Sequence, residues 1–286
     1  KPVFFYPAMN VNMWNNKIIK KNIITLKNHG YIVADTDEGQ LACGDEGNGR
    51  LIEPEFIFEN IINYFDSQPN LKLKGIKALV TAGPTIEPID PVRYISNKSS
   101  GKQGYSFAEE LANLGADVSL ISGPTNLPKP KNVNNFYQVE TAEEMFNACA
   151  KKIPKDLFIS VAAVTDWSVK NQSLKKIKKT NFNPSIKLKE NKDILKFVSL
   201  HQKRPKLVVG FAAETNSIKK NAREKLKEKN CDILIANNIS KKNVVFGSET
   251  NSVNIFDKTG FVAKYIKLRK NDISKKILKD IICPRL

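Results

Sequence analysis

The pattern of apolar and polar positions from Ile76 onward predicts alternating strands and helices. Short apolar runs are typical of buried strands, and amphipathic stretches between them are typical of helices. The predicted strands cover residues 76–81, 117–122, 157–164, 206–213 and 231–237, and the predicted helices cover 102–115, 141–152 and 217–229. This order predicts an α/β fold with a Rossmann-like, doubly wound and mostly parallel sheet. Ligands of such sheets bind at the carboxyl ends of the strands.

The ends of the chain show other patterns. A hairpin is predicted from 252–256 and 261–268, and a last helix from 271–283. The N-terminal part predicts a helix over 20–30 that ends at Gly30, a short strand over 31–34, a glycine-rich loop over 35–50 and a helix over 54–65. A polar stretch follows. We therefore predict two domains, residues 1–66 and 76–286, joined by a linker over 67–75.

Composition narrows the function classes. The 286 residues are 41% hydrophobic and 26% charged, as in globular proteins, and no window of 18 residues is apolar enough for a membrane helix. The net charge of +17 comes from scattered lysines, with no arginine-rich arm. This favours an anionic substrate over nucleic acid. The four cysteines and two histidines lack the spacing of a zinc site, so we expect reduced thiols in a cytoplasmic protein without a membrane partner.

The loop after the first strand of the sheet carries the strongest candidate chemistry. Residues 81–104, TAGPTIEPIDPVRYISNKSSGKQG, lead directly into a helix, whose N-terminus is suited to phosphate. The loop is neither a Walker A motif, which would need glycine at Ser96, nor a GxGxxG motif. A solvated turn with a capping serine explains SNKSSGK equally well.

Three further features allow two interpretations each. Asp166 follows the strand 157–164 and could bind a ribose or a base amine, or be a solvated loop residue. The lysine-rich stretch 170–181 could be a lid over a phosphate site or a solvated face. Phe211 could cover a base or belong to the core.

Ordered motifs resemble those of the phosphopantothenate–cysteine ligase family. They are ALVTAGPTIEPIDPVRYISNKSSGKQG at 78–104, then AAVTDW, KKIKK, GFAAET, ANNIS and FGSETNSV, and the resemblance spans about residues 76–270. PAMNVNMW (7–14) and ACGDEGNGRLIEP (42–54) resemble the C-terminal part of phosphopantothenoylcysteine decarboxylase, a flavodoxin-like flavoprotein. The order of the two parts along the chain, decarboxylase and then ligase, resembles that in the bifunctional bacterial family of coenzyme A biosynthesis. The family's N-terminal decarboxylase part, with its catalytic histidine and most of the flavin site, is not in this sequence, so we expect an incomplete decarboxylase.

The resemblance implies a CTP-dependent reaction. The carboxylate of 4′-phosphopantothenate attacks the α-phosphate of CTP, pyrophosphate leaves, and the amine of L-cysteine then attacks the acyl-cytidylate and releases CMP. Positioning and charge stabilisation dominate such a reaction. Mg²⁺ would bridge the triphosphate oxygens with few protein ligands. FMN is expected only with a complete decarboxylase domain. The family also implies a homodimer through the ligase domain, and a higher oligomer when the decarboxylase is whole.

The resemblance also implies residue roles. Asn97 would contact the acyl-cytidylate with help from Arg93, Asp166 would meet the cytosine, and Lys176 would be the lysine needed for turnover. The remaining CTP contacts would come from Ser160, where the family often has glycine, and from Lys192, Asp193, Ile194, Leu195, Phe211, Lys225 and Lys229. Lys225 and Lys229 lie one helical turn apart and can face the phosphates together. In the decarboxylase part, Asn10 would hold the substrate carboxylate and Cys43 would donate a proton.

Two rival functions remain from the residues alone. A nicotinamide-dependent oxidoreductase would share the sheet topology, and a basic nucleic-acid-binding protein would share the charge.

Overall fold

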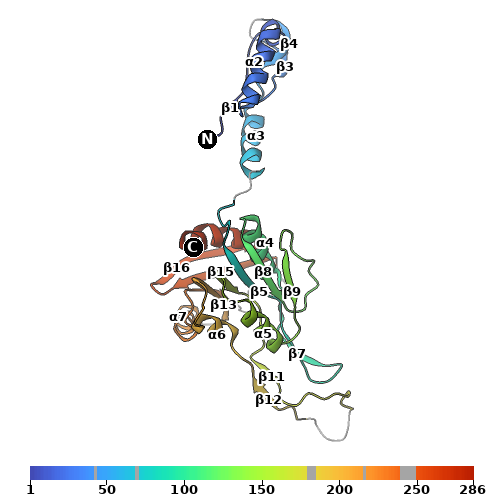
Figure 1. Ribbon diagram of the computed structural model, residues 1–286, viewed down its shortest axis with the longest axis vertical. Helices are drawn as coiled ribbons and strands as arrows, with labels where there is room; N and C mark the ends of the chain where they lie inside the picture. The colour runs from blue at the N-terminus through green and yellow to red at the C-terminus, as the bar shows by residue number, and fades with distance from the viewer. Residues whose placement is uncertain (42–43, 68–70, 179–184, 215–216, 239–248) are drawn as a thin grey trace. The chain divides into compact units, whose positions relative to one another are not determined.

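The computed structural model describes the chain except for residues 42–43, 68–70, 179–184, 215–216 and 239–248. The chain forms two compact units, Lys1–Pro69 and Asn70–Leu286 (Figure 1). The border between them falls inside the stretch 67–75 that the sequence suggests as a linker.

The larger unit is built on an eight-stranded sheet with the order β16-β15-β14-β13-β10-β5-β8-β9. Six neighbouring strands are parallel, and the last two in the chain are antiparallel. The parallel strands are β5 (Lys77–Ala82), β8 (Asp117–Ser122), β9 (Asn135–Gln138), β10 (Leu157–Ser160), β13 (Leu207–Glu214) and β14 (Ile233–Asn238). The antiparallel strands are β15 (Thr250–Asp257) and β16 (Gly260–Arg269). The strand order reverses between β5 and β10, which is the switch point of a Rossmann-type sheet. The predicted fold class is confirmed.

Helices cover both faces of this sheet. On one face, α4 (Lys102–Asn113) and α8 (Lys270–Ile277) pack Phe107, Leu111 and Ile277 against the strands. On the other face, α5 (Ala142–Lys152), α6 (Ile194–Leu200) and α7 (Ile218–Lys229) contribute Met145, Val198 and Leu226. Because strand side chains alternate between faces, Val80 belongs to the first core and Leu79 to the second. The predicted helix over 271–283 continues past α8 as a π-helix, Leu278–Ile282, and a short 3₁₀ turn, Cys283–Arg285.

Several short elements differ from the sequence-based expectation. The strand predicted over 157–164 leaves the sheet at Ser160, and residues 161–164 become a loop. Helix α6 and strand β9 were not predicted. Neither were two antiparallel pairs, β6 (Ile86–Pro88) with β7 (Tyr94–Ser96) and β11 (Trp167–Val169) with β12 (Leu188–Glu190). Three-residue strands are too short to show an alternating pattern.

Two glycines fix where α4 begins. Gly101, the N-cap residue, has a φ of +76°, a conformation that glycine adopts at little cost. At Gly104 a Cβ atom would lie 2.5 Å from the Cβ of Ala82, so glycine allows the helix to approach β5 closely. The first turn of α4 is thereby held at the carboxyl end of β5.

The described residues of the smaller unit form three helices and two strand pairs. The helices are α1 (Val11–Trp14), α2 (Lys17–Asn28) and α3 (Pro54–Ser67); β1 (Phe4–Phe5) pairs in parallel with β2 (Ile32–Val33). The predicted loop over 35–50 is wrong in part, because β3 (Asp37–Gln40) and β4 (Glu46–Arg50) form an antiparallel hairpin there. Helix α2 starts three residues earlier than predicted, since the Asn16 side chain caps it by accepting from the amide of Ile18.

Among the described residues, no helix has the length and apolar character needed to span a bilayer.

Candidate active site

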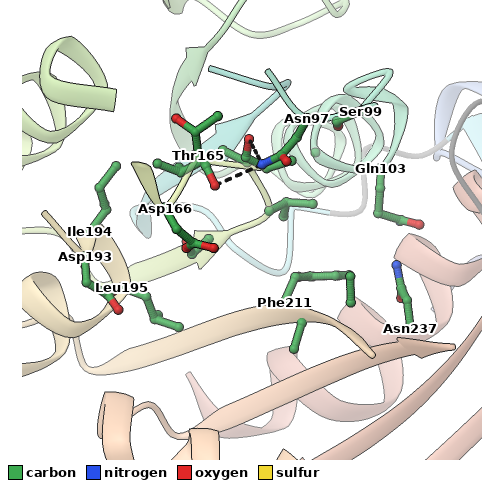
Figure 2. A pocket seen from close by; sticks show the side chains of 18 of the residues that line it. Asn97, Ser99, Gln103, Thr165, Asp166, Asp193, Ile194, Leu195, Phe211 and Asn237 are labelled. Atoms are coloured by element: carbon green, nitrogen blue, oxygen red, sulfur yellow. Dashed lines mark hydrogen bonds between the residues drawn. The ribbon is translucent and has the colours of Figure 1, made fainter. Parts of the chain in front are cut away.

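The larger unit contains a pocket of about 700 Å³ at the carboxyl ends of β5, β10, β13 and β14 (Figure 2). Its walls are the start of α4, the loop after β10, the start of α6, and residues of β13 and β14. This is the edge where the strand order reverses, and ligands of open α/β sheets bind there. The pocket brings together ten of the site residues expected from the sequence: Asn97, Ser160, Asp166, Lys192, Asp193, Ile194, Leu195, Phe211, Lys225 and Lys229.

The first turn of α4 supplies backbone donors to this pocket. Gly101 has no side chain to cap the helix, and the first amides of an α-helix have no acceptor within the helix itself. Lys102, Gln103 and Gly104 all line the pocket. The hydroxyl of Ser99 accepts from the amide of Gly101 at 3.3 Å and does not cap the helix. The geometry therefore favours an anion site over the alternative of a turn with a capping serine.

Asn97 joins two loops at the edge of the pocket. Its Nδ2 donates to the carbonyl oxygens of Ala163 and Val164, both at 3.1 Å (Figure 2). These two residues belong to the apolar run that leaves the sheet after β10. The amide of Asn97 thus fixes the loop that precedes Asp166.

A buried network holds the backbone just before Asp166. The carboxylate of Glu87 accepts from the Thr165 hydroxyl at 2.9 Å and from the amide of Ala142 at 2.9 Å. The amide of Thr165 donates to the Thr85 hydroxyl, and Nδ2 of Asn191 donates to the Thr165 carbonyl. Asp166 itself is exposed and lines the pocket. Its position is therefore set by neighbours that are far apart in the sequence.

The start of α6 forms the opposite wall. Asp193 caps this helix, because Oδ1 accepts from the amide of Lys196 at 2.8 Å. Nζ of Lys192 lies 4.8 Å from the centroid of the Phe146 ring. Ile194 and Leu195 add apolar surface. Phe211 on β13 meets the buried ring of Phe107 edge to face, with 5.6 Å between centroids, so its orientation is fixed by the core.

Lys225 and Lys229 both have carboxylate partners on the protein. Nζ of Lys225 lies 2.7 Å from Oε1 of Glu214, and Nζ of Lys229 lies 2.8 Å from Oδ2 of Asp193. Burial lowers the pKa of Lys229, but its hydrogen bonds with Asp193 and Glu228 outweigh burial and raise that pKa overall. Both lysines line the pocket from α7 with much of their charge already balanced.

Arg93 and Lys176 are not among the described residues that line the pocket. The guanidinium of Arg93 binds the carboxylate of Asp90 through Nε and Nη2, and Nη2 also donates to the carbonyl of Ile177 at 3.0 Å. Asp90 further accepts from the amide of Ile177. The hydrogen bond from Arg93 holds the pKa of Asp90 well below its ordinary value. We call these contacts between Asp90, Arg93 and Ile177 the Asp90–Arg93 clasp. Lys176 is exposed and directly precedes Ile177 in the sequence.

Several polar residues of the pocket were not identified from the sequence, and four of them come from elements that carry no expected site residue or lie deep in the pocket. They are Gln103 on α4, Asn237 on β14, Asn251 on β15 and Lys270 at the start of α8. Asn237 and Asn251 lie within the motifs ANNIS and FGSETNSV, which could have drawn attention to them. Lys270 gives no such signal, since it is one of many lysines and lies at the border between two elements.

In the smaller unit, Asn10 caps α1 by accepting from the amide of Asn12 at 2.8 Å. Its Nδ2 donates to Oδ2 of Asp45 at 2.8 Å. The side-chain amide therefore already meets a carboxylate. Cys43 lies outside the described residues.

Comparison of the chain with known proteins shows the family to which it belongs. Residues 73–283 match the family model described as the DNA/pantothenate metabolism flavoprotein C-terminal domain, and residues 1–66 match the model described as Flavoprotein. The coenzyme A biosynthesis bifunctional protein CoaBC of Bacillus subtilis (strain 168) is 42% identical over 281 residues, which cover 98% of this chain and 69% of that protein. The protein of the same name from Haemophilus influenzae is 41% identical over 98% of this chain and 69% of its own length. The chain belongs to this family of bifunctional coenzyme A biosynthesis enzymes.

A solved structure of the same family supports the fold of the larger unit. The C-terminal domain of a coenzyme A biosynthesis bifunctional protein CoaBC is 39% identical, with a TM-score of 0.61, over 74% of this chain and 96% of that chain.

The match of residues 1–66 to the flavoprotein model supports an association of FMN with the decarboxylase part of the family. Of the described residues in the smaller unit, only Val33 and Gly49 are buried.

Proposed function

We propose that the chain joins 4′-phosphopantothenate to L-cysteine with CTP, through an acyl-cytidylate, and yields phosphopantothenoylcysteine, CMP and pyrophosphate. The observation that carries this proposal is the pocket at the switch point of the sheet. It combines the uncapped start of α4, the amide of Asn97, the carboxylate of Asp166 and the ring of Phe211. These groups offer donors for phosphate, a polar contact for an acyl group, and an acceptor and an apolar wall for a base.

The residues act mainly by positioning. Asp166 accepts from the amino group of cytosine, and Ile194, Leu195 and Phe211 cover the faces of the base. The carboxylate of phosphopantothenate attacks the α-phosphorus, the bond to the β-phosphate breaks, and pyrophosphate leaves. Asn97 holds the resulting acyl-cytidylate while the amine of cysteine attacks the acyl carbon and CMP leaves. Little covalent chemistry falls to the protein, so orientation and charge stabilisation supply most of the rate.

We assign Mg²⁺ to the phosphates. The described residues contain no group of three or more histidine, cysteine or acidic side chains suited to a metal ion. Mg²⁺ commonly binds through substrate phosphates, one or two carboxylates and several waters, and the described pocket suits that mode.

Lys176 and Arg93 have a different place in this proposal. Lys176 is exposed on the segment that the Asp90–Arg93 clasp holds. In this proposal its ammonium group reaches the developing charge from outside the described pocket walls.

We also propose that the larger unit acts as a homodimer.

The decarboxylase half of the proposal rests on the family. With a complete decarboxylase domain, phosphopantothenoylcysteine would be decarboxylated to 4′-phosphopantetheine with FMN. Asn10 would hold the substrate carboxylate, and the hydrogen bond from its Nδ2 to the carboxylate of Asp45 supports this role. Cys43 would donate the proton.

A pyrophosphate-release assay tests the ligase. With CTP, Mg²⁺ and 4′-phosphopantothenate the protein should release pyrophosphate, and CMP should appear only when L-cysteine is added. Asp166→Ala should raise the KM for CTP, because it removes the acceptor for the amino group of the base. Release at the same rate without phosphopantothenate would contradict the reaction. A clear preference for ATP would contradict the choice of nucleotide.

A further inference from the structure

Asp166, which recognises cytosine in the proposed function, is positioned by its backbone. Figure 2 shows Thr165 next to Asp166 on the wall of the pocket, opposite Phe211. Within the described part of the chain, the Asp166 carboxylate has no hydrogen bond or ion pair. The direction in which this carboxylate points therefore depends on how the backbone of residues 165–166 is held.

Two neighbours hold this backbone from opposite sides. Asn191 follows β12, and its backbone amide donates to the carbonyl of Asp166 at 2.9 Å, while its Nδ2 donates to the carbonyl of Thr165 at 2.9 Å. On the other side, the Thr85 hydroxyl accepts from the amide of Thr165 at 3.0 Å. Thr85 and Thr165 are 0% and 4% exposed, so water has little access to these hydrogen bonds.

The Glu87 carboxylate sets the direction of the hydroxyl hydrogen bonds. A carboxylate only accepts, so the Thr165 hydroxyl donates its proton to Oε1 of Glu87, at 2.9 Å. The Thr165 oxygen is then the acceptor for the Thr85 hydroxyl, 3.0 Å away, and the Thr85 oxygen accepts from the Thr165 amide. This chain of hydrogen bonds therefore has a single arrangement, in which each bond strengthens the next.

The burial of this carboxylate indicates a role beyond packing. Glu87 is 5% exposed, and a buried charge lowers stability unless hydrogen bonds compensate it. One such bond comes from the amide of Ala142, the first residue of α5, where the helix dipole also favours a negative charge. The other comes from Thr165. Glu87 thus connects the pocket wall that carries Asp166 to the start of a helix that packs in the core.

We propose that Glu87 and Thr165 are positioning residues that determine the selectivity of the pocket for cytosine over uracil. The inference rests on the proposed function, in which the Asp166 carboxylate accepts from the amino group of the base. Uracil has a carbonyl oxygen in place of that amino group, so a fixed carboxylate repels it. When the chain of hydrogen bonds is broken, Asp166 can turn away, which weakens the contact with cytosine and relieves the repulsion of uracil. Glu87 acts without touching the base.

Pyrophosphate release with CTP and with UTP tests this inference. In the presence of 4′-phosphopantothenate, L-cysteine and Mg²⁺, kcat/KM for the wild type should favour CTP by roughly tenfold or more, as expected for one well-placed contact to a base. Thr165→Val keeps the shape of the side chain without its hydroxyl. It should reduce the preference by about threefold or more, the effect of one lost hydrogen bond, through a higher KM for CTP and not for UTP. Thr165→Ser retains the hydroxyl and should keep a preference close to that of the wild type.

Thr141→Val is the matched control. The Thr141 hydroxyl caps α5 by accepting from the amide of Glu144 at 3.1 Å, and Thr141 is not among the described residues that line the pocket. The same substitution therefore weakens the start of α5 without touching Thr165. Denaturant unfolding measures the loss of stability in both variants, and the preference for CTP should stay within about twofold of the wild type in Thr141→Val, because a cap acts on the stability of the helix.

A double variant covers the case in which Thr165→Val does not fold because the Glu87 carboxylate is left without that partner. Glu87→Met/Thr165→Val removes both groups, which costs less than removing one of them. Its preference for CTP should fall by about as much as in Thr165→Val, since both variants break the same contact.

The outcomes separate this inference from the function on which it rests. A folded Thr165→Val or double variant that keeps the preference, while Asp166→Ala loses it, would overturn the inference and leave the proposed function standing. An equal loss of preference in Thr141→Val would also overturn the inference, because the stability of α5 would then explain the effect. Equal kcat/KM values for CTP and UTP in the wild type would overturn the proposed nucleotide together with the inference.

Discussion

At the scale of single residues, Asn97 shows how one side chain serves both structure and chemistry. Its Nδ2 donates to two carbonyls of the loop that leads to Asp166, so the amide fixes the wall against which the acyl group would lie. An aspartate at this position would set a carboxylate against two carbonyl oxygens. It would lose both hydrogen bonds and add repulsion.

We therefore expect Asn97→Asp to separate the two half-reactions. The acyl-cytidylate should still form, and its reaction with cysteine should slow by roughly a hundredfold, the loss typical of a reacting group that is misplaced by about 1 Å. Rapid-quench measurements of pyrophosphate and CMP in the same reaction report the two steps. Asn113→Asp is the matched control, because Oδ1 of Asn113 accepts a hydrogen bond from Asn132 and an aspartate keeps that acceptor. If CMP release kept pace with pyrophosphate release in Asn97→Asp, Asn97 would have no part in the second step.

The sequence predicts most of the residues that line the pocket, but it does not predict the ion pairs that balance the charges of its lysines. Asn97, Asp166 and Phe211 lie in motifs near the ends of predicted strands, and the rule that ligands bind at those ends is enough to group them. Lys225 and Lys229 also have the right spacing to share a face of α7. Their pairing with Glu214 and Asp193 depends on how α7 rotates against β13 and α6, which spacing does not determine.

At the scale of elements, a clasp joins the loop between β6 and β7 to the lysine-rich segment. Arg93 and Ile177, 84 positions apart, meet through a hydrogen bond, and Asp90 accepts from both. Because Arg93 holds the pKa of Asp90 well below its ordinary value, the clasp stays charged above the unfolded pKa of about 3.9. Its contribution to stability declines as the pH falls below the unfolded pKa and is gone below the lowered folded-state pKa.

Asp90→Asn should loosen the segment that bears Lys176 without disturbing the pocket. Misplacing a catalytic group by about 1 Å costs on the order of a hundredfold in rate, so we expect kcat to fall by up to that factor. CTP affinity should stay at the wild-type value, and the pH–rate profile near neutrality should keep its shape, because Asp90 does not titrate there. Steady-state kinetics and calorimetry measure the two effects. Asp257→Asn, which breaks the ion pair with Arg285, is the control. A wild-type kcat in Asp90→Asn would show that the clasp does not position Lys176.

The elements that the sequence missed are those set by tertiary contacts. The apolar run 157–164 predicts one strand, yet pairing with the neighbouring strands stops at Ser160. The carbonyls of Ala163 and Val164 are then used by Asn97, and the amide of Ala163 donates to Gly83. An apolar pattern shows burial and not which backbone groups pair, so it could not reveal that this run ends as a pocket wall.

At the scale of the whole molecule, the two units differ in how much core they have. Both apolar clusters lie within the larger unit and begin no earlier than Leu73. In the smaller unit, Val33 and Gly49 are the only buried residues among those described. The described residues that line the pocket also all belong to the larger unit. Folding and nucleotide binding of the larger unit should therefore not depend on residues 1–69.

This independence can be tested with a fragment of residues 70–286. We expect it to unfold in one cooperative transition and to bind CTP and diphosphate within about threefold of the full chain, because every described pocket residue and its core support are retained.

The substitution Phe107→Ala supplies the comparison, since Phe107 is fully buried and its ring orients Phe211. That variant should lose about 3–5 kcal/mol of unfolding free energy in the fragment and in the full chain alike, as expected for a buried phenylalanine. Denaturant unfolding and calorimetry on the four proteins give both quantities. A fragment that folds but binds the nucleotide more than about tenfold more weakly would mean that residues 1–69 contribute to the site. Unequal losses from Phe107→Ala in the two contexts would mean that they contribute to the core.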